Sequence, residues 1–366
     1  MGSTTKTTNF FRNKPLFGLD IGNGSLKVMQ VDDETVETKG KSHRQPRVIG
    51  YGTASFDKAA IDNGVIVQPE IIARATLELF RHHLIGDITA RRAAIAIPTY
   101  RTFIRSVQLP LLKPKELKEA VSLEAEQYIP MALDELYMDY EQLGQVKEQF
   151  EVLAVAVPRK IVDSHLELMH ILGLDAVLIE PTMAAAGRLF TQDTQSDVPT
   201  VIIDFGSLSS DIAVFDGKIL ATGTVPGGGM VFTNSIKDKL KVTQEEAGLI
   251  KTKYGMGVSK HQKEIREALE PTLDQIVKEL RRMIRYYDER YGAERPVKQL
   301  ITLGGGANMP GLSEYLTNEL RLAVRPCDPW QYFNYKGLQP PGAADKSMYA
   351  TVAGLSLVPP HGVFAK

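Results

Sequence analysis

The sequence predicts an α/β fold of two related lobes, and three features support this prediction. A short pattern occurs twice, as "LDIGNGSLK" at residues 19–27 and as "IDFGSLSSD" at residues 203–211. Both copies hold an Asp, a Gly two positions later and a Ser five positions later. Apolar runs of strand length alternate with segments of helical spacing, and 366 residues suffice for two buried sheets. Internal similarity at this separation indicates two related domains rather than a short repeat array.

Each copy of the pattern predicts a strand, a tight turn and a second strand. An apolar run precedes the Asp in both copies, and an alternating run follows the turn, "LKVMQV" in the first and "DIAVF" in the second. After the second copy, Asp216 and Gly217 favour a further hairpin turn. The polar stretch at residues 32–46 suggests a longer loop.

The remaining elements follow the same α/β pattern. Three apolar runs that end at a proline are expected to be buried strands of a mixed sheet, at residues 93–98, 152–158 and 175–181. Helical spacing lies between them, at residues 69–82 and 160–172. The second half holds expected strands at residues 200–206 and 299–303, separated by a long helical region. An apolar stripe in that region predicts core packing for Leu273, Ile276, Val277, Leu280, Ile284 and Tyr287.

Composition excludes several classes of function. The formal net charge of −1 and the pI of about 6.7 do not favour a nonspecific nucleic-acid binder. Cys327 is the single cysteine, which excludes an internal disulfide and a multi-thiolate metal site. Residues 1–14 lack the apolar segment of a signal peptide, and no apolar run is long enough to cross a bilayer. We therefore expect a cytoplasmic protein that reaches a membrane only through partners.

The two turns together predict a nucleotide clamp, although one such turn alone is more often an ordinary turn. Glycines let backbone N–H groups approach phosphate oxygens, and serines add hydroxyl donors. The expected phosphate-binding residues are Gly22, Asn23, Gly24, Ser25, Lys27, Gly206, Ser207 and Ser209. Asp20 and Asp204 would repel phosphate directly, so we expect them to hold Mg²⁺ through its retained waters.

A third glycine-rich segment, "LGGGANMPGL" at residues 303–312, lies between an expected strand and an expected helix. It is either a tight connection or a surface for a nucleoside, and the nucleoside hypothesis uses Gly304, Gly305, Gly306 and Asn308. "TVPGGG" at residues 224–229 is a candidate neighbour of the phosphates.

A further helix with a capping box is expected at residues 243–255, formed by Thr243 and Glu246. Gly248 in its middle costs about 1 kcal/mol relative to Ala, which suggests that something approaches this face. Lys251, three residues later, is either solvated or a contact for a ribose hydroxyl.

These motifs together resemble the superfamily of actin, Hsp70 and the sugar kinases. "DIGNGSLK" and "DFGSLSSD" are similar to its two phosphate loops, "IEPTMAAAG" at residues 179–187 to its first connecting segment, and "LGGGANMPG" to its adenosine segment. The resemblance implies an actin-like duplicated ATPase fold, with two lobes built on mixed five-stranded sheets flanked by helices. It also implies ATP and Mg²⁺ as ligands.

An insert at residues 109–143 closely resembles that of the PilM family of type IV pilus assembly, with "EAEQYIP" as the signature. Residues 279–292 and 347–357 are also similar to PilM helices. The related FtsA family typically ends in a basic amphipathic helix, whereas this chain ends "PPHGVFAK". The implied first lobe comprises residues 15–97 and 152–198, with the insert at residues 98–151. The implied second lobe comprises residues 199–235 and 297–360, with a nucleotide-side subdomain at residues 236–296. Residues 1–14 and 361–366 are the N-terminal and C-terminal tails.

Resemblance to PilM implies a groove between the insert and the first lobe that takes the cytoplasmic N-terminal peptide of a PilN-like inner-membrane protein. The candidate groove residues are Phe103, Val121, Glu124, Tyr128 and Tyr137. Glu124 falls within the apolar stripe of a helix expected at residues 114–129, and it is alternatively an edge carboxylate paired with a Lys or Arg. Pilus motor ATPases and further copies of the chain are additional candidate partners.

Three functions from different classes remain open at this point. The first is an ATP-binding scaffold of the pilus platform in twitching motility, the second a polymerising protein similar to FtsA, and the third a small-molecule kinase of the same fold. The kinase lacks a recognisable acceptor site. Asp163 lies where fold relatives orient water for hydrolysis, but it can equally cap its helix. We therefore expect slow ATP hydrolysis or none.

Overall fold

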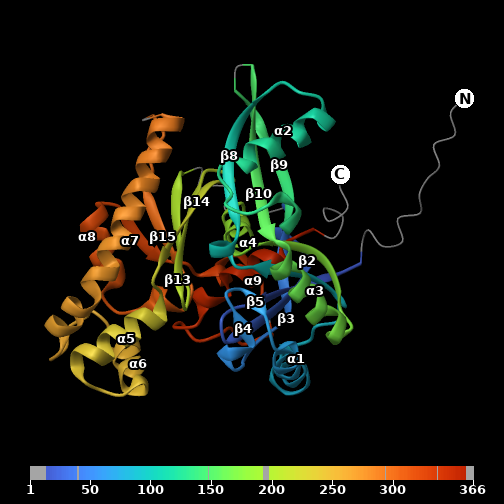
Figure 1. Ribbon diagram of the computed structural model, residues 1–366. Coiled ribbons are helices and arrows are strands. Elements are labelled where there is room, and N and C mark those ends of the chain that lie inside the picture. Colours follow the sequence, from blue (N-terminus) through green and yellow to red (C-terminus); the bar gives the residue numbers. More distant parts are fainter. Residues whose placement is uncertain are drawn as a thin grey trace, which may run out of the picture.

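Two sheets with flanking helices form the framework of the molecule (Figure 1). The computed structural model describes residues 14–38, 41–146, 148–192, 198–292, 294–335 and 337–359. The strands of the first sheet are β1 (Leu16–Ile21), β2 (Ser25–Thr38), β3 (Lys41–Ser55), β6 (Ile85–Gly86), β7 (Arg92–Ile97) and β11 (Asp175–Pro181). Among the described residues their order is β11-β7-β1-β2-β3-β6, so the first lobe has the two-residue strand β6 in addition to the five strands expected.

The second lobe repeats this arrangement. Its strands are β12 (Thr200–Phe205), β13 (Ser209–Phe215), β14 (Ile219–Pro226), β15 (Gln299–Leu303) and β16 (Ala323–Pro326), in the order β14-β13-β12-β15-β16. In both lobes an antiparallel hairpin carries the repeated turn, β1–β2 in one and β12–β13 in the other, and a parallel strand lies beside it. The predicted duplicated α/β fold is therefore confirmed.

Helices cover both sheets and join the lobes. They are α1 (Pro69–Glu78), α3 (Arg159–Leu172), α4 (Thr182–Phe190), α5 (Gly229–Leu240), α6 (Gln244–Lys253), α7 (Gln262–Tyr291), α8 (Leu312–Leu320) and α9 (Ala350–Ser356). The predicted stripe on α7 packs in the core of the second lobe, where Leu273, Ile276 and Leu280 are buried. Helices α4 and α9 pack so closely that a Cβ on Gly354 would lie 1.8 Å from the carbonyl oxygen of Ala185. A side chain at Gly354 would therefore force these two helices apart.

The insert has a small sheet of its own. It consists of β8 (Phe103–Pro110), β9 (Leu136–Val146) and β10 (Gln149–Pro158), in the order β8-β10-β9, with α2 (Pro114–Glu126) packed on one face. Residues 152–158 do form the predicted strand, but it pairs within this sheet rather than within the sheet of the first lobe. The expected boundary between residues 151 and 152 therefore falls inside β10.

Two sequence-based boundaries differ from the structure. Residues 32–46 extend the β2–β3 hairpin, apart from residues 39 and 40, which lie outside the described residues, so the expected long loop was wrong. The hydrogen bonds of a two-stranded ladder join backbone groups, which every residue other than proline supplies in the same way, so a polar stretch can form one. Helix α2 ends at Glu126 rather than Ile129, because Ile129 precedes Pro130 and the residue before a proline disfavours helix.

Candidate functional site

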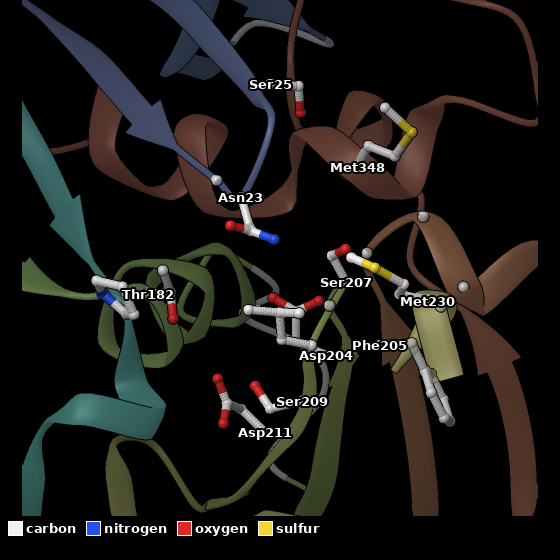
Figure 2. A pocket seen from close by; sticks show the side chains of 18 of the residues that line it. Asn23, Ser25, Thr182, Asp204, Phe205, Ser207, Ser209, Asp211, Met230 and Met348 are labelled. Carbon is white, nitrogen blue, oxygen red and sulfur yellow. The ribbon is translucent and has the colours of Figure 1, made fainter. Parts of the chain in front are cut away.

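Both repeated turns line one cavity of about 670 Å³ between the lobes. The first lobe contributes the β1–β2 turn, the segment at residues 58–64, Tyr100 and the buried His165 of α3. The second lobe contributes the β12–β13 turn, the start of α5, one face of α6 and the glycines that follow β15. Figure 2 shows Asn23 and Asp204 pointing toward one another across this cavity, with Ser209 and Asp211 beside Asp204.

The first turn carries a compensated charge. Asp20 at the end of β1 lies opposite Lys27 on β2, and the ammonium nitrogen is 3.6 Å from the carboxylate. Both residues are buried, at 8% and 7% exposure. The Gly22 N–H donates to the Ser25 carbonyl oxygen at 2.9 Å and closes the turn. This turn therefore brings backbone and side-chain donors to the cavity without a net charge of its own.

The second turn concentrates negative charge. Asp204 lies opposite Asp211 in the same register that joins Asp20 to Lys27 in the first turn. Burial, followed by the charges of Asp211 and Asp20, raises the pKa of Asp204 from 3.8 to about 7. Burial also raises the pKa of Asp211 to about 6, although a hydrogen bond of 2.7 Å from Thr224 opposes this shift.

Backbone segments pack closely against the second turn at two glycines, Gly304 and Gly228. Gly304 has φ of +77°, and a Cβ there would come 2.2 Å from a carboxylate oxygen of Asp204. A Cβ on Gly228 would come 2.3 Å from the carbonyl oxygen of Gly206, to which the Gly229 N–H donates at 2.8 Å. "TVPGGG" therefore packs against the second turn through Gly228 and Gly229.

Helix α6 forms the far wall of the cavity. Its capping box is confirmed, since the Glu246 N–H donates to Thr243 Oγ1 at 3.2 Å and the Thr243 N–H donates to the Glu246 carboxylate at 2.9 Å. Gly248 lines the cavity, and nothing lies within 4 Å of where its Cβ would be. The space that a side chain at this position would occupy therefore belongs to the cavity.

Lys251 also lines this wall and donates from Nζ to the Gly229 carbonyl oxygen at 2.7 Å and to Thr233 Oγ1 at 2.8 Å. Its pKa is lowered by burial and then by the charge of Lys58 on the opposite lobe. Two lysines from different lobes therefore face a common space, which suits an anion bound between them.

The structure brings most of the predicted nucleotide-site residues together. Those that line the cavity are Asp20, Gly22, Asn23, Ser25, Lys27, Asp204, Gly206, Ser207, Ser209, Lys251, Gly304, Gly305 and Gly306. Gly24 lies under the side chain of Lys58, whose Cγ would be 2.8 Å from a Cβ at this position. Asn308 donates from Nδ2 to the Ala344 carbonyl oxygen and to Ser347 Oγ, both at 2.7 Å, and so positions the segment beside the cavity.

Asp163 is not brought to the cavity. It lies on α3, where its carboxylate accepts a hydrogen bond of 3.0 Å from the hydroxyl of Tyr137 in the insert. The cavity is lined instead by His165, two residues further along the same helix. Two residues along an α-helix rotate a side chain by about 200°, so Asp163 and His165 lie on opposite faces of α3. A position near the start of a helix therefore did not determine which way Asp163 faces.

Among the residues of the cavity that the sequence reasoning missed are an aspartate and a lysine, Asp211 and Lys58. Asp211 ends the second copy of the repeat at the position of Lys27 in the first, so comparison of the two copies would have found it. Lys58 comes from a short 3₁₀ turn at Lys58–Ala60, outside any recognisable motif, and no signal in one sequence points to it.

The acidic side chains suit a hydrated cation. In the part of the chain that the structure describes, no three His, Cys, Asp or Glu side chains lie close enough to hold a metal ion directly. Asp20, Asp204 and Asp211 nevertheless line the same cavity. Burial raises the pKa values of the last two, and the charges of Asp211 and Asp20 raise that of Asp204 further. Mg²⁺ commonly keeps several waters and is bound through carboxylates and substrate phosphates, which this donor set fits.

Comparison with known proteins decides the family. The family model described as type IV pilus assembly protein PilM matches residues 18–358. The chain belongs to the PilM family. A solved PilM-PilN type IV pilus biogenesis complex contains a chain that is 24% identical, with a TM-score of 0.79, and the match covers 96% of this chain and 99% of that one.

More distant relatives share the actin-like fold. MreB5 of Spiroplasma citri, solved with AMPPNP, is 14% identical with a TM-score of 0.50, and the match covers 93% of this chain and 94% of that one. The cell division protein FtsA of Neisseria meningitidis serogroup B is 26% identical over 153 residues, or 38% of this chain. That match spans only 36% of FtsA. In the described residues, no helix is both long and apolar enough to span a membrane.

The five predicted groove residues do not share one surface in this PilM-family chain. Val121 is 2% exposed and packs between α2 and the insert sheet, so it belongs to the core. Phe103 and Tyr128 are partly buried against the same side, and Arg105 lies over the Tyr128 ring at 4.7 Å. Glu124 accepts a hydrogen bond of 3.1 Å from Gln127 rather than pairing with a Lys or Arg.

Tyr137 lies instead at the junction of the insert with the first lobe. Its side chain is 40% exposed, Arg159 of α3 lies over its ring at 4.3 Å, and its hydroxyl donates to Asp163. Neighbouring side chains on a strand point to opposite faces, which places Tyr137 away from Met138 and the α2 side. Leu166, one helical turn after Asp163, is also 40% exposed. Tyr137 therefore lies on a different side of the insert sheet from Phe103 and Tyr128.

Proposed function

We propose that this PilM-family protein binds ATP with Mg²⁺ between its lobes and docks an extended peptide of a PilN-like inner-membrane protein. The observation that carries the nucleotide part is the pairing of two equivalent turns around one cavity, one with a compensated Asp20–Lys27 pair and one with Asp204 and Asp211. The first turn suits phosphate oxygens, and the second suits the cation that accompanies them.

Each part of the cavity has a role in this proposal. The backbone of the two turns, with Ser25 and Ser209, binds the phosphates. Asp20, Asp204 and Asp211 hold Mg²⁺ through its waters, and the cation neutralises phosphate charge when it is bound. Lys251 and the open space at Gly248 receive the ribose, and Gly304 to Gly306 support the base. Because both lobes contribute, nucleotide binding stabilises the closed arrangement.

Hydrolysis is proposed to be slow or absent. The residue that the sequence suggests for orienting water, Asp163, accepts a hydrogen bond from Tyr137, and Glu180 at the end of β11 accepts two hydrogen bonds of 2.6 Å from Arg188. Orienting water for phosphoryl transfer requires a side chain at the cavity, and Asp163 does not line it. The proposed output of the site is therefore binding rather than turnover.

The peptide is proposed to dock where the insert meets the first lobe. The solved relative is a complex with PilN, and extended peptides commonly add to a free sheet edge. In the described part of the chain β9 pairs only with β10, so β9 is such an edge, and its Tyr137 end lies beside Arg159 and Asp163 of α3. The protein would thus be cytoplasmic and reach the inner membrane through its partner.

Two matched substitutions test both parts of the proposal. Asp20→Ala should abolish the thermal stabilisation that saturating MgATP gives, which is about 2.7 kcal/mol at a concentration of 100 Kd. Asp163→Ala should keep that stabilisation and weaken binding of a synthetic peptide that copies the N-terminus of the PilN-like protein. Thermal unfolding and fluorescence anisotropy measure the two effects. An unchanged MgATP shift in Asp20→Ala would show that the proposed clamp is wrong.

A further inference from the structure

The α6 wall of the cavity carries no carboxylate. The residues of α6 that line the cavity are Gln244, Gly248, Lys251 and Thr252. Among the residues that the structure describes, the acidic ones that line the cavity all belong to the two copies of the repeat. The Gln244 amide donates to Asn234 Oδ1 at 2.9 Å, and the Thr252 hydroxyl donates to the Gly248 carbonyl oxygen at 2.5 Å. This wall therefore offers a ribose hydroxyl only uncharged acceptors, which form weaker hydrogen bonds than an ionised carboxylate.

The same wall carries a lysine with spare hydrogen-bonding capacity. Lys251 donates from Nζ to the Gly229 carbonyl oxygen at 2.7 Å and to Thr233 Oγ1 at 2.8 Å, both in α5. An ammonium group has three N–H donors, so one donor remains for a ligand. Because the other two bonds already fix the ammonium group, a ligand that uses the third does not have to immobilise a long, free side chain.

A second lysine reaches the same space from the first lobe. The stem of Lys58 lies along the first turn, where its Cγ would be 2.8 Å and its Cε 3.3 Å from a Cβ on Gly24. Among the described residues, no Asp or Glu forms an ion pair with Lys58 or Lys251. Burial, and then the charge of Lys58, lowers the pKa of Lys251. Two cations without a carboxylate partner thus face each other across the cavity, and an anion between them would relieve their repulsion.

The structure leaves room for such an anion beside Lys251. Gly248 precedes Lys251 by three residues in α6, so both positions lie on the same face of the helix. Gly248 lines the cavity, and no atom lies within 4 Å of where its Cβ would be. A phosphate group is larger than a hydroxyl and needs this space. The wall therefore combines space and positive charge, which a phosphate requires, and lacks the ionised acceptor that suits a free ribose diol.

We propose that Lys58 and Lys251 form an anion subsite beside the ribose, so that the cavity prefers adenine nucleotides with a phosphate on the ribose 2′ or 3′ oxygen. This inference rests on the proposed function and names the ligand class of its nucleotide site. The two turns hold the 5′ phosphates, and the two lysines donate to the ribose phosphate from opposite lobes. A nucleotide with a free diol binds without an ionised acceptor at the ribose, so ADP and 2′-deoxyADP should bind with similar affinity.

Calorimetric titration of the full chain with Mg²⁺ tests the subsite with probes that differ by one group. ADP is compared with its 2′-phosphorylated and 3′-phosphorylated derivatives, and the ratio of dissociation constants is the gain from the ribose phosphate. We expect a gain of about tenfold or more for at least one isomer, decreasing as salt is added. Inorganic phosphate is the probe for an isolated anion site, and it should bind far more weakly than either phosphorylated ADP.

Substitutions of the two lysines test which groups supply the gain. Lys58→Met and Lys251→Met should each reduce it several-fold, because each removes one cation and keeps an apolar stem. Lys58 is exposed, so its replacement is compatible with the fold even if Lys251→Met unfolds. Lys253→Met is the matched control, since Lys253 belongs to the same helix but does not line the cavity, and it should keep the full gain.

Substitution of Gly248 tests the opposite preference. Gly248→Glu supplies the missing ionised acceptor and repels a second anion, so it should abolish the gain and make ADP bind several-fold more tightly than 2′-deoxyADP. Gly248→Gln has the same size without the charge. It should leave ADP and 2′-deoxyADP nearly equal, which separates the effect of charge from that of lost space.

The outcomes distinguish this inference from the proposed function. If the unmodified protein binds ADP but gains less than about twofold from either ribose phosphate, the inference is overturned and the proposed function stands. A full gain in both lysine variants would also overturn it, because the phosphate would then be held elsewhere. Inorganic phosphate that binds as tightly as phosphorylated ADP would show an isolated anion site instead of a nucleotide subsite. Failure of the unmodified protein to bind ATP or ADP would overturn the proposed function, and the inference with it.

Discussion

The two repeated turns have the same backbone and opposite electrostatics. In each, the Asp that ends one strand lies opposite the final residue of the motif on the next strand. That residue is Lys27 in the first turn and Asp211 in the second. The first pair is oppositely charged at 3.6 Å. The second pair joins two carboxyls whose pKa values are raised by burial, and the charge of Asp211 raises that of Asp204 further.

This difference shows how a duplicated hairpin can divide one task between two lobes. If both turns kept a lysine, the site would have no acidic surface for a cation. If both kept an aspartate, burial of four carboxylates would oppose both folding and phosphate binding. One residue at one register position thus separates a phosphate side from a cation side.

The largest expected effect comes from making the first turn resemble the second. Lys27→Met leaves Asp20 buried without its counter-charge, and removing one partner of a buried pair costs about 3 kcal/mol. Urea unfolding without nucleotide should show a loss of this size. The double variant Lys27→Met with Asp20→Asn should recover most of it, because no unpaired charge then remains. Equal losses in the single and double variants would contradict the charge explanation.

Crowding around Asp204 sets the second turn apart in another way. Gly304→Ala would place a Cβ 2.2 Å from the Asp204 carboxylate at a backbone φ of +77°, so we expect a loss of about 2 kcal/mol and displacement of Asp204. Gly305→Ala is the matched control, since its Cβ would meet only Met348 Sδ, at an ordinary 3.7 Å. It should change stability by less than about 0.5 kcal/mol. Thermal unfolding of both variants without nucleotide measures the difference.

The repeat made the lobes and the turns predictable from sequence. Asp20 and Asp204 occupy strand ends, where the turn that follows must reach the cleft, so local pattern determines their place. The hairpins are also local, which is why the order of strand, turn and strand followed from residues close together in sequence. Gly304 to Gly306 were found for the same reason, because strand, glycine turn and helix are consecutive.

Long-range placement was not predictable in the same way. Strand 152–158 has the composition of a buried strand, but composition does not say which sheet it joins, and it pairs with β8 and β9. Asp163 lies on the expected helix, yet the rotation of that helix turns it toward Tyr137. Val121 was placed on the right stripe, but the stripe packs on the insert sheet and is not left open. Each of these differences depends on which distant element provides the partner surface.

A smaller effect concerns pH and distinguishes the two turns directly. The folded pKa values of Asp204 and Asp211, about 7 and about 6, exceed their ordinary value of 3.8. The folded state therefore binds more protons between pH 4 and 7, so this contribution to stability falls as pH rises through that window and is constant above it. Asp211→Asn should reduce the fall and raise stability at pH 8 by about 1 kcal/mol.

The measurement for Asp211→Asn is urea unfolding of the nucleotide-free and metal-free protein at pH 5 and pH 8. Comparing the variant with the unmodified chain at each pH removes the contributions of other titrating groups, because they are common to both. If the free energy of unfolding depended on pH in the same way in the variant and in the unmodified chain, burial of Asp211 in the second turn would not oppose folding at high pH. Asp163→Asn, a substitution at an exposed carboxylate outside the cavity, should leave the dependence unchanged.

The smallest expected effect tests whether the lobe of the second turn also reserves space for the nucleoside. Gly248→Ala should stabilise α6 by about 0.5–1 kcal/mol, because alanine favours a helix interior and the new Cβ meets no atom within 4 Å. The same Cβ would enter the cavity, so ATP affinity should fall several-fold while the protein becomes more stable. Lys253→Ala, on the last turn of α6 and outside the cavity lining, should leave ATP affinity unchanged. Calorimetric titration measures both affinities. If Gly248→Ala became more stable without losing ATP affinity, the nucleoside would not lie against α6. The second lobe would then contribute to ATP binding through its phosphate contacts alone.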